Sequence, residues 1–164
     1  MGKRLRKSRT RIARSDFSVA FWDTSALLKL YVRERDSDRF AELIRTSIDR
    51  TVISQLTLAE MHRALWGKAL ARAIPAKLAD TTYREFRSDI EAVALTVLPL
   101  GREVEHEFDR IVPLCYRANP AVPIRTLDGL VLASAVVART PELVSTDSRM
   151  RRAAVLLGLR ILPE

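Results

Sequence analysis

The stretch FWDTSALLKLY, residues Phe21–Tyr31, places one aspartate between an apolar run and a segment with helical periodicity. The residues before Asp23 predict a strand, and those after it predict a helix. A carboxylate at this junction can cap the helix, or it can belong to a site at the edge of a sheet. One copy of the pattern leaves both interpretations open. The question is therefore whether other acids reach the same edge.

The length and composition predict one globular domain in a reducing compartment. The chain has 164 residues, and its hydrophobic content of 48% is enough for a sizeable core. No apolar run is long enough to cross a bilayer, so we expect no membrane association. A single cysteine, Cys115, cannot form an internal disulfide and is typical of a cytoplasmic protein. The two histidines and this cysteine lack the spacing of the usual zinc sites.

The net charge of +8 is concentrated at the N-terminus. Residues 1–15 hold seven of the 28 bases and none of the 20 acids, so the remainder is nearly neutral. This basic segment has little apolar surface to bury, and we expect a mobile extension ahead of a domain that spans residues 16–164. It could attract phosphates non-specifically and in a salt-dependent way, or be a simple solvated extension. An organellar transit peptide is a third possibility.

Strand-like and helix-like segments alternate along the domain. Short apolar runs predict strands at Ser18–Trp22, Thr51–Ser54, Thr96–Leu98, Glu142–Ser145 and Arg160–Leu162. Helical periodicity predicts helices at Thr24–Val32, Ser37–Ile48, Thr57–Ala73, Pro75–Val93, Gly101–Tyr116, Leu127–Ala138 and Ser148–Leu157. The two prolines within Asn119–Thr126 favour an irregular loop. This alternation predicts an α/β fold with a mainly parallel sheet of about five strands, flanked on both faces by helices.

Four acids are expected at the carboxyl edge of that sheet. Asp23 and Asp147 follow the first and fourth predicted strands, and Glu60 lies in the helix after the second. Asp128 begins the helix that leads into the fourth strand, so it also lies at the carboxyl edge. In an open parallel sheet this edge is where ligands bind.

Each of these acids also has an ordinary explanation. Thr57 and Glu60 fit a capping box, Asp147 is a good helix cap, and Thr126 could cap the helix that contains Asp128. Together, however, four anions in one cleft would repel each other, and a hard divalent cation offsets such repulsion. Oxygen-only ligands suit Mg²⁺ or Mn²⁺, and such a site is typical of phosphodiester hydrolysis.

Four stretches now carry a family resemblance: FWDTSALLKLY, SQLTLAEMHRAL, RTLDGLVLASA and LVSTDSRMRRAAVLLGLRIL. In this order and with these separations the chain, from about Val19 to Leu162, resembles a PIN-domain ribonuclease of the VapC toxin type. The resemblance implies a PIN-like three-layer fold and an endoribonuclease that depends on Mg²⁺ or Mn²⁺. It also implies a homodimer that is held inactive by a cognate antitoxin protein.

The resemblance assigns roles to individual residues. It implies that Asp23 and Asp128 are the main metal ligands, and that Glu60 and Asp147 complete the cluster directly or through water. Three hydroxyl-bearing residues beside the acids would orient the carboxylates: Thr24, Ser25 and Thr146.

Two features depart from the family pattern. Members often have histidine where this chain has Val131, a position that is not a metal ligand. The arginine-rich segment 1–15 is absent from the typical compact toxin, which leaves the target and partner of this chain open.

Several residues could contact RNA. Arg149, Arg151 and Arg152 follow the last acid and could bind phosphates, or they could form a solvated helix face; Lys29 and Arg33 have the same two interpretations. Trp66 could stack on a base, whereas Trp22 beside Asp23 is expected to pack in the core.

Two alternatives to a toxin ribonuclease remain. One is a PIN fold that acts without turnover, as a nucleic-acid-binding or scaffold module. The other is an RNA-processing or DNA-directed nuclease of the same fold.

Overall fold

The sheet of this protein is wholly parallel and has the strand order β3-β2-β1-β4-β5. The computed structural model describes residues 18–46 and 48–164, so the basic segment 1–15 lies outside the described residues. The strands are β1 (Val19–Trp22), β2 (Arg50–Ser54), β3 (Leu95–Leu98), β4 (Glu142–Val144) and β5 (Arg160–Leu162). The predicted α/β fold with a mainly parallel sheet of about five strands is confirmed.

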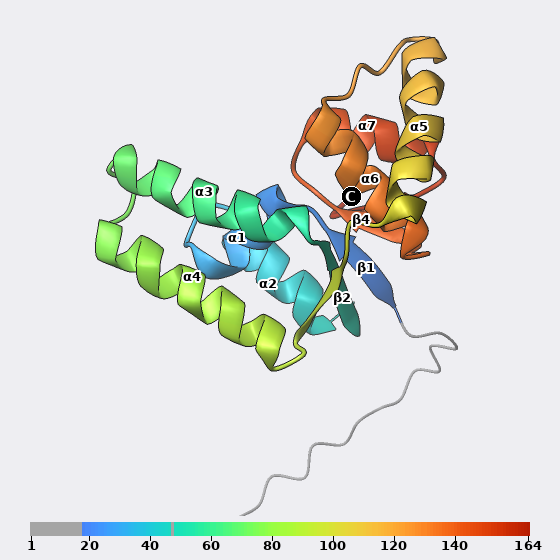
Figure 1. Cartoon of the computed structure of the whole chain (residues 1–164). Coiled ribbons are helices and arrows are strands. Elements are labelled where there is room, and N and C mark those ends of the chain that lie inside the picture. Colours follow the sequence, from blue (N-terminus) through green and yellow to red (C-terminus); the bar gives the residue numbers. More distant parts are fainter. Residues whose placement is uncertain (1–17, 47) are drawn as a thin grey trace, which may run out of the picture.

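Helices cover both faces of the sheet, which gives three layers (Figure 1). One face packs against α1 (Thr24–Tyr31), α2 (Ser37–Thr46), α3 (Leu56–Leu70) and α4 (Ala76–Glu91). The other face packs against α5 (Arg102–Arg117), α6 (Thr126–Val137) and α7 (Ser148–Leu156). The irregular segment predicted at Asn119–Thr126 forms the connection between α5 and α6. No helix in the described part of the chain has the length and apolar character needed to span a bilayer.

Alternation along β1 divides the core into two clusters. Ala20 and Trp22 point into the cluster beneath α1–α4, whereas Phe21 points into the cluster beneath α5–α7. This is the period of two that a strand imposes on its side chains. β1 is the central strand of the sheet, and its three fully buried side chains hold the residue after it, Asp23, in a fixed position.

The strand order runs in opposite directions on the two sides of β1. The strand pairs with β2 on one side and with β4 on the other. In open parallel sheets such a reversal of strand order opens a crevice at the carboxyl ends, where ligands bind. Asp23 follows β1, and Ser145 follows β4, so both lie at this point of the sheet.

Close packing of α5 on α6 fixes the start of α6. A Cβ atom on Gly129 would lie 2.7 Å from Cε2 of Phe108, so a larger residue here would push the two helices apart. Val131, which replaces the histidine of many family members, is buried in the same cluster. Asp128 precedes Gly129 and is therefore held at the sheet edge by this contact.

The helices α3 and α4 form an antiparallel pair that extends beyond the sheet (Figure 1). Their inner sides pack through Met61, Leu65 and Phe86. The helix α3 ends at Leu70 rather than at the predicted Ala73. The reason is the positive φ of 57° at Arg72, which turns the chain towards α4.

Candidate functional site

Asp23 lies at the end of β1 and is almost completely buried, with 6% of its surface exposed. Its Oδ2 atom accepts hydrogen bonds from the hydroxyls of Ser25 at 2.5 Å and Ser145 at 3.0 Å. The backbone N–H of Ser25 donates to the same atom at 3.4 Å, which makes Asp23 the cap of α1. Burial raises the pKa of this carboxyl, although the hydrogen bonds from Ser25 and Ser145 act to lower it.

Glu60 does not take part in the predicted capping box. The helix α3 begins at Leu56, one residue earlier than predicted, so Thr57 lies inside the first turn and does not cap it. The buried hydroxyl of Thr57 has no hydrogen-bond partner within the described residues. Glu60 instead accepts a hydrogen bond from the hydroxyl of Thr24 at 2.5 Å. Its carboxylate is therefore held by a side chain of α1, across the space between two helices.

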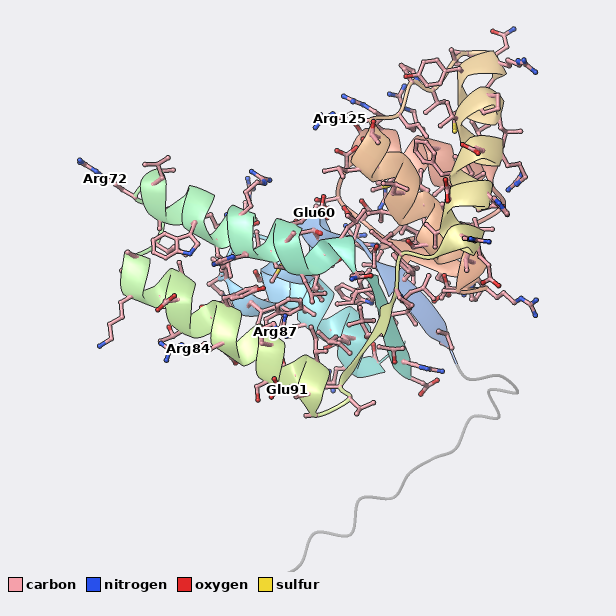
Figure 2. All side chains as sticks on the ribbon, viewed as in Figure 1. Glu60, Arg72, Arg84, Arg87, Glu91 and Arg125 are labelled. Atoms are coloured by element: carbon pink, nitrogen blue, oxygen red, sulfur yellow. The ribbon has the colours of Figure 1, made fainter. Side chains whose placement is uncertain are left out.

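The pKa of Glu60 reveals which charges lie near it. Burial raises this pKa most, and the negative charges of Asp23 and Asp128 raise it further. The hydrogen bond from Thr24 and the positive charge of Arg63 lower it. Asp23, which follows β1, and Asp128, in α6, thus both lie within electrostatic reach of Glu60 in α3. In Figure 2, Glu60 lies at the end of α3 that faces α6, and Arg125 lies where α6 begins.

Asp128 and Asp147 each hold the start of a helix. Oδ1 of Asp147 accepts from the backbone N–H groups of Arg149 at 2.8 Å and Met150 at 3.0 Å, which is the cap predicted for α7. Oδ2 of Asp128 accepts from the backbone N–H of Arg125 at 3.3 Å. Thr126 is the first residue of α6 and Arg125 occupies the cap position, so the predicted cap at Thr126 is wrong by one residue.

Hydroxyl groups connect the ends of β1 and β4. The Ser25 hydroxyl, besides donating to Asp23, accepts from the backbone N–H of Thr146 at 3.1 Å. The Ser145 hydroxyl donates to Asp23 and accepts from the backbone N–H of Asp147 at 3.1 Å. Thr24 and Ser25 thus bond carboxylates directly, as expected of residues that orient them, whereas Thr146 contributes its backbone.

Ser145 is the site residue that sequence reasoning missed. We assigned it to the end of the fourth strand, but β4 stops at Val144 and leaves Ser145 free to turn towards β1. It is fully buried and bridges Asp23 to the backbone of Asp147. The available signal was its place in the run Ser145-Thr146-Asp147, where two hydroxyls precede an acid.

The arginines after Asp147 differ in what they contact. The guanidinium of Arg151 donates to the carbonyls of Ser145 at 2.9 Å, Leu162 at 3.3 Å and Pro163 at 2.9 Å. It therefore ties the C-terminal segment to the end of β4, and its contact with RNA stays a prediction. Arg149 is half-buried and Arg152 is exposed, and their contact with substrate stays a prediction.

The other candidate RNA-binding residues are mostly engaged within the protein. Lys29 forms ion pairs of 2.6 Å with both Glu34 and Asp36. Arg33 pairs with Asp38 on the surface. Trp22 is fully buried and packs edge-on against Phe40, as expected. Trp66 is 44% exposed and remains available to a ligand.

The acids supply the right kind of donor for a hard cation but do not form a closed cage. Within residues 18–46 and 48–164, no three acidic, histidine or cysteine side chains are close enough together to hold a metal ion. The charge pattern nevertheless suits a cation, because Asp23 and Asp128 both disfavour the ionised form of Glu60. The side chains that donate to Asp23 and Glu60 are hydroxyls, and carboxylate and hydroxyl oxygens are donors that suit Mg²⁺ or Mn²⁺.

The fold is similar to that of several solved structures. FitAcB from Neisseria gonorrhoeae superposes with a TM-score of 0.66 and 16% identity, covering 87% of this chain and 95% of that chain. VapC20 from Mycobacterium tuberculosis, a toxin that cleaves the sarcin-ricin loop, gives a TM-score of 0.60 and 15% identity, covering 86% and 98%. VapBC2 from Rickettsia felis, solved with a DNA fragment from its promoter, gives 0.59 and 13%, covering 87% and 96%. At these identities the similarity establishes the fold alone.

Sequence comparison identifies the family. No curated protein matches the chain significantly. The family model of the PIN domain matches residues 20–156, which include all four acids of the site. The chain therefore belongs to the PIN domain family.

Proposed function

We propose that this protein is an endoribonuclease that depends on Mg²⁺ or Mn²⁺ and acts as the toxin of a VapC-type toxin–antitoxin pair. The observation that carries the proposal is that the negative charges of Asp23 and Asp128 both raise the pKa of Glu60, which indicates that both lie near it. Asp23 lies where the strand order reverses, which is the ligand-binding position of open α/β sheets.

Asp23 and Asp128 would be the main ligands of the cation, and Glu60 and Asp147 would complete its coordination directly or through water. The hydroxyls of Ser25 and Ser145 fix the orientation of the Asp23 carboxylate, and that of Thr24 fixes Glu60. Such hydrogen-bonded neighbours set the position and basicity of metal ligands. The bound cation supplies Lewis-acid activation of water and stabilises the leaving oxygen in phosphodiester hydrolysis.

The neighbouring structures support the choice of RNA and of an antitoxin partner. VapC20 is a toxin that cleaves the sarcin-ricin loop, and the similar structure from Klebsiella pneumoniae is a toxin–antitoxin complex. By analogy, a cognate antitoxin would bind this chain and hold it inactive. A homodimer in the cytoplasm is part of the same proposal.

A catalytically silent PIN module that binds nucleic acid or serves as a scaffold is the second candidate. It is favoured by one observation: among the described residues, no three acidic side chains lie close enough together to surround a metal ion. A silent module would have the same fold but would not cleave RNA when metal is added, so the two functions predict different results in an RNA-cleavage assay.

The proposal is tested by cleavage of a mixed RNA pool with purified protein in Mg²⁺, in Mn²⁺ and in EDTA. We expect cleavage with either metal and none in EDTA. Asp128→Asn is the matched variant, since it removes one proposed ligand and leaves the size of the side chain unchanged. Cleavage in EDTA, or cleavage by the variant at the wild-type rate, would contradict the metal-dependent mechanism.

A further inference from the structure

Besides Glu60, the helix α3 carries an exposed tryptophan, Trp66, whose ring contacts neighbouring side chains. Trp66 is 44% exposed, in contrast to Trp22, which is fully buried. Its indole Nε1 donates a hydrogen bond to Nε2 of His62 at 3.2 Å. The His62 ring in turn stacks on Tyr83 of α4, with 4.3 Å between ring centroids and 17° between planes. The orientation of Trp66 is therefore fixed by a histidine that is itself held by a stacked ring.

The side chain of Arg63 lies between Trp66 and Glu60 along α3. Arg63 is exposed, and within the described residues it has no hydrogen-bond or ion-pair partner. It is nevertheless close enough to Glu60 to lower the pKa of that carboxyl. Glu60, Arg63 and Trp66 are spaced by three residues, so each neighbours the next on the helix surface. At about 1.5 Å per residue, Trp66 lies roughly 9 Å along the axis from Glu60.

The sequence around the tryptophan is rich in bases. Between Met61 and Lys77 the sequence has four bases and no acid: Arg63, Lys68, Arg72 and Lys77. Lys68 is paired with Glu34, and Arg72 extends from the far end of α3 (Figure 2). A rigid exposed ring within a positive surface is the arrangement that single-stranded nucleic acids use, because bases stack on the ring and phosphates meet the cations.

We propose that Arg63 and Trp66 form an RNA subsite next to the acids, in which Arg63 binds a phosphate and Trp66 stacks on a base of an unpaired nucleotide. The subsite deepens the proposed nuclease function and rests on it for its role in substrate choice. Since stacking needs an exposed base face, the subsite selects single-stranded over duplex RNA. Stacking accepts every base, so it contributes affinity and register rather than a sequence code.

The test follows the tryptophan emission of the full-length protein during titration with RNA in EDTA, where no cleavage occurs. Trp22 is buried, so a change in emission reports on Trp66. We expect single-stranded RNA to quench the emission and duplex RNA of the same sequence to leave it unchanged. Anisotropy of labelled RNA establishes whether each RNA is bound.

Substitutions separate stacking from other uses of this surface. Trp66→Ala should weaken single-stranded RNA binding about tenfold, whereas Trp66→Phe, which keeps a ring, should lose less. Arg63→Gln should reduce the salt dependence of binding by about one counterion, in contrast to the smaller effect of Arg84→Gln on α4. Leu70→Ala is the control for apolar docking, because Leu70 is 88% exposed on the same helix. Circular dichroism confirms that each variant is folded.

Two results would overturn the subsite. One is unchanged emission when the anisotropy shows complete binding of single-stranded RNA. The other is loss of a dimer in both Trp66→Ala and Leu70→Ala with RNA affinity unchanged, which would make this face an interface between copies. Because the titration needs no metal, a failed subsite is distinguishable from a failed nuclease, which is judged by metal-dependent cleavage.

Discussion

The acids on the two sides of the site serve the fold differently. Asp147 caps α7 with two backbone hydrogen bonds, and Asp128 accepts one at the start of α6. Asp23 and Glu60 are bonded mainly by the hydroxyls of neighbouring side chains. Asp23 caps α1 only through a long bond of 3.4 Å from the Ser25 N–H, and Glu60 caps no helix, so these two acids add less to helix stability than Asp147 does.

Burial adds a second difference between the acids, in their pKa values. The pKa values of Asp23 and Glu60 are both raised, chiefly by burial. A carboxyl whose pKa is higher in the folded state than in the unfolded state reduces stability as the pH rises above its unfolded value. At neutral pH these two acids therefore oppose folding. The proposed metal site would explain their presence, while that of Asp147 is explained in part by the helix that it caps.

The largest expected effect is on activity, from the acids proposed as main ligands. Asp23→Asn and Asp128→Asn should each reduce RNA cleavage by at least about a hundredfold, since each removes a charge from the proposed metal site. The free energy of unfolding should stay within about 1 kcal/mol of wild type or rise, because an amide relieves the repulsion. Cleavage kinetics and urea denaturation measure the two effects. If either variant lost stability together with activity, its acid would serve the fold rather than a metal site.

The next effect concerns Ser145, which joins the two kinds of acid. Ser145→Ala leaves Asp23 without one of its donors and the N–H of Asp147 without its acceptor, at a cost of about 1 to 3 kcal/mol in unfolding free energy. It should also weaken Mn²⁺ binding about ten- to a hundredfold. Ser25→Ala is the matched variant, since Ser25 bonds the same Asp23 oxygen. Wild-type stability in Ser145→Ala would show that the bridge contributes nothing.

A smaller effect is expected from removing the α7 cap. Asp147→Ala should lower the unfolding free energy by about 1 kcal/mol, and Asp147→Asn by less, since asparagine also caps helices. Glu60→Gln should not reduce stability, because Gln can still accept the Thr24 hydrogen bond and carries no buried charge. Urea denaturation of the three variants checks the order. If Glu60→Gln were the most destabilised, the division between capping and site acids would be wrong.

The smallest effect separates the two arginines of α7. Arg151→Gln should lower the unfolding free energy by about 0.5 to 1 kcal/mol, because its partly exposed guanidinium binds three carbonyls. Arg152→Gln, on the exposed side, should change it by less than about 0.5 kcal/mol. Thermal denaturation compares the pair. Equal stability of the two variants would return Arg151 to the list of residues available to RNA.

The sequence was enough to predict the sheet. Apolar runs and helical periodicity locate the elements, and parallel strands must end at one edge, so Asp23, Glu60, Asp128 and Asp147 could be expected at that edge without knowing the strand order; that they bind a metal together stays a prediction. The contacts between them could not be predicted. Ser145 reaches Asp23 because β4 lies beside β1, and that neighbourhood is set by the strand order rather than by local sequence.

Small shifts in helix starts account for the other differences. The pattern Thr57 to Glu60 has the spacing of a capping box, yet α3 begins one residue early and turns Thr57 into the interior. Glu60 then bonds Thr24, which lies 36 residues away in sequence. Arg151 bonds the carbonyls of Leu162 and Pro163, contacts that depend on where β5 ends. Local propensity describes single elements, and these roles belong to pairs of elements.

The most direct test of the proposed site is calorimetric titration of the full-length protein with Mn²⁺, beside Asp23→Asn and Asp147→Asn. We expect the wild-type protein to bind Mn²⁺, Asp23→Asn to lose binding, and Asp147→Asn to bind more weakly but measurably. Absence of binding by the wild-type protein, or equal affinity in Asp23→Asn, would contradict a carboxylate metal site and favour the silent PIN module.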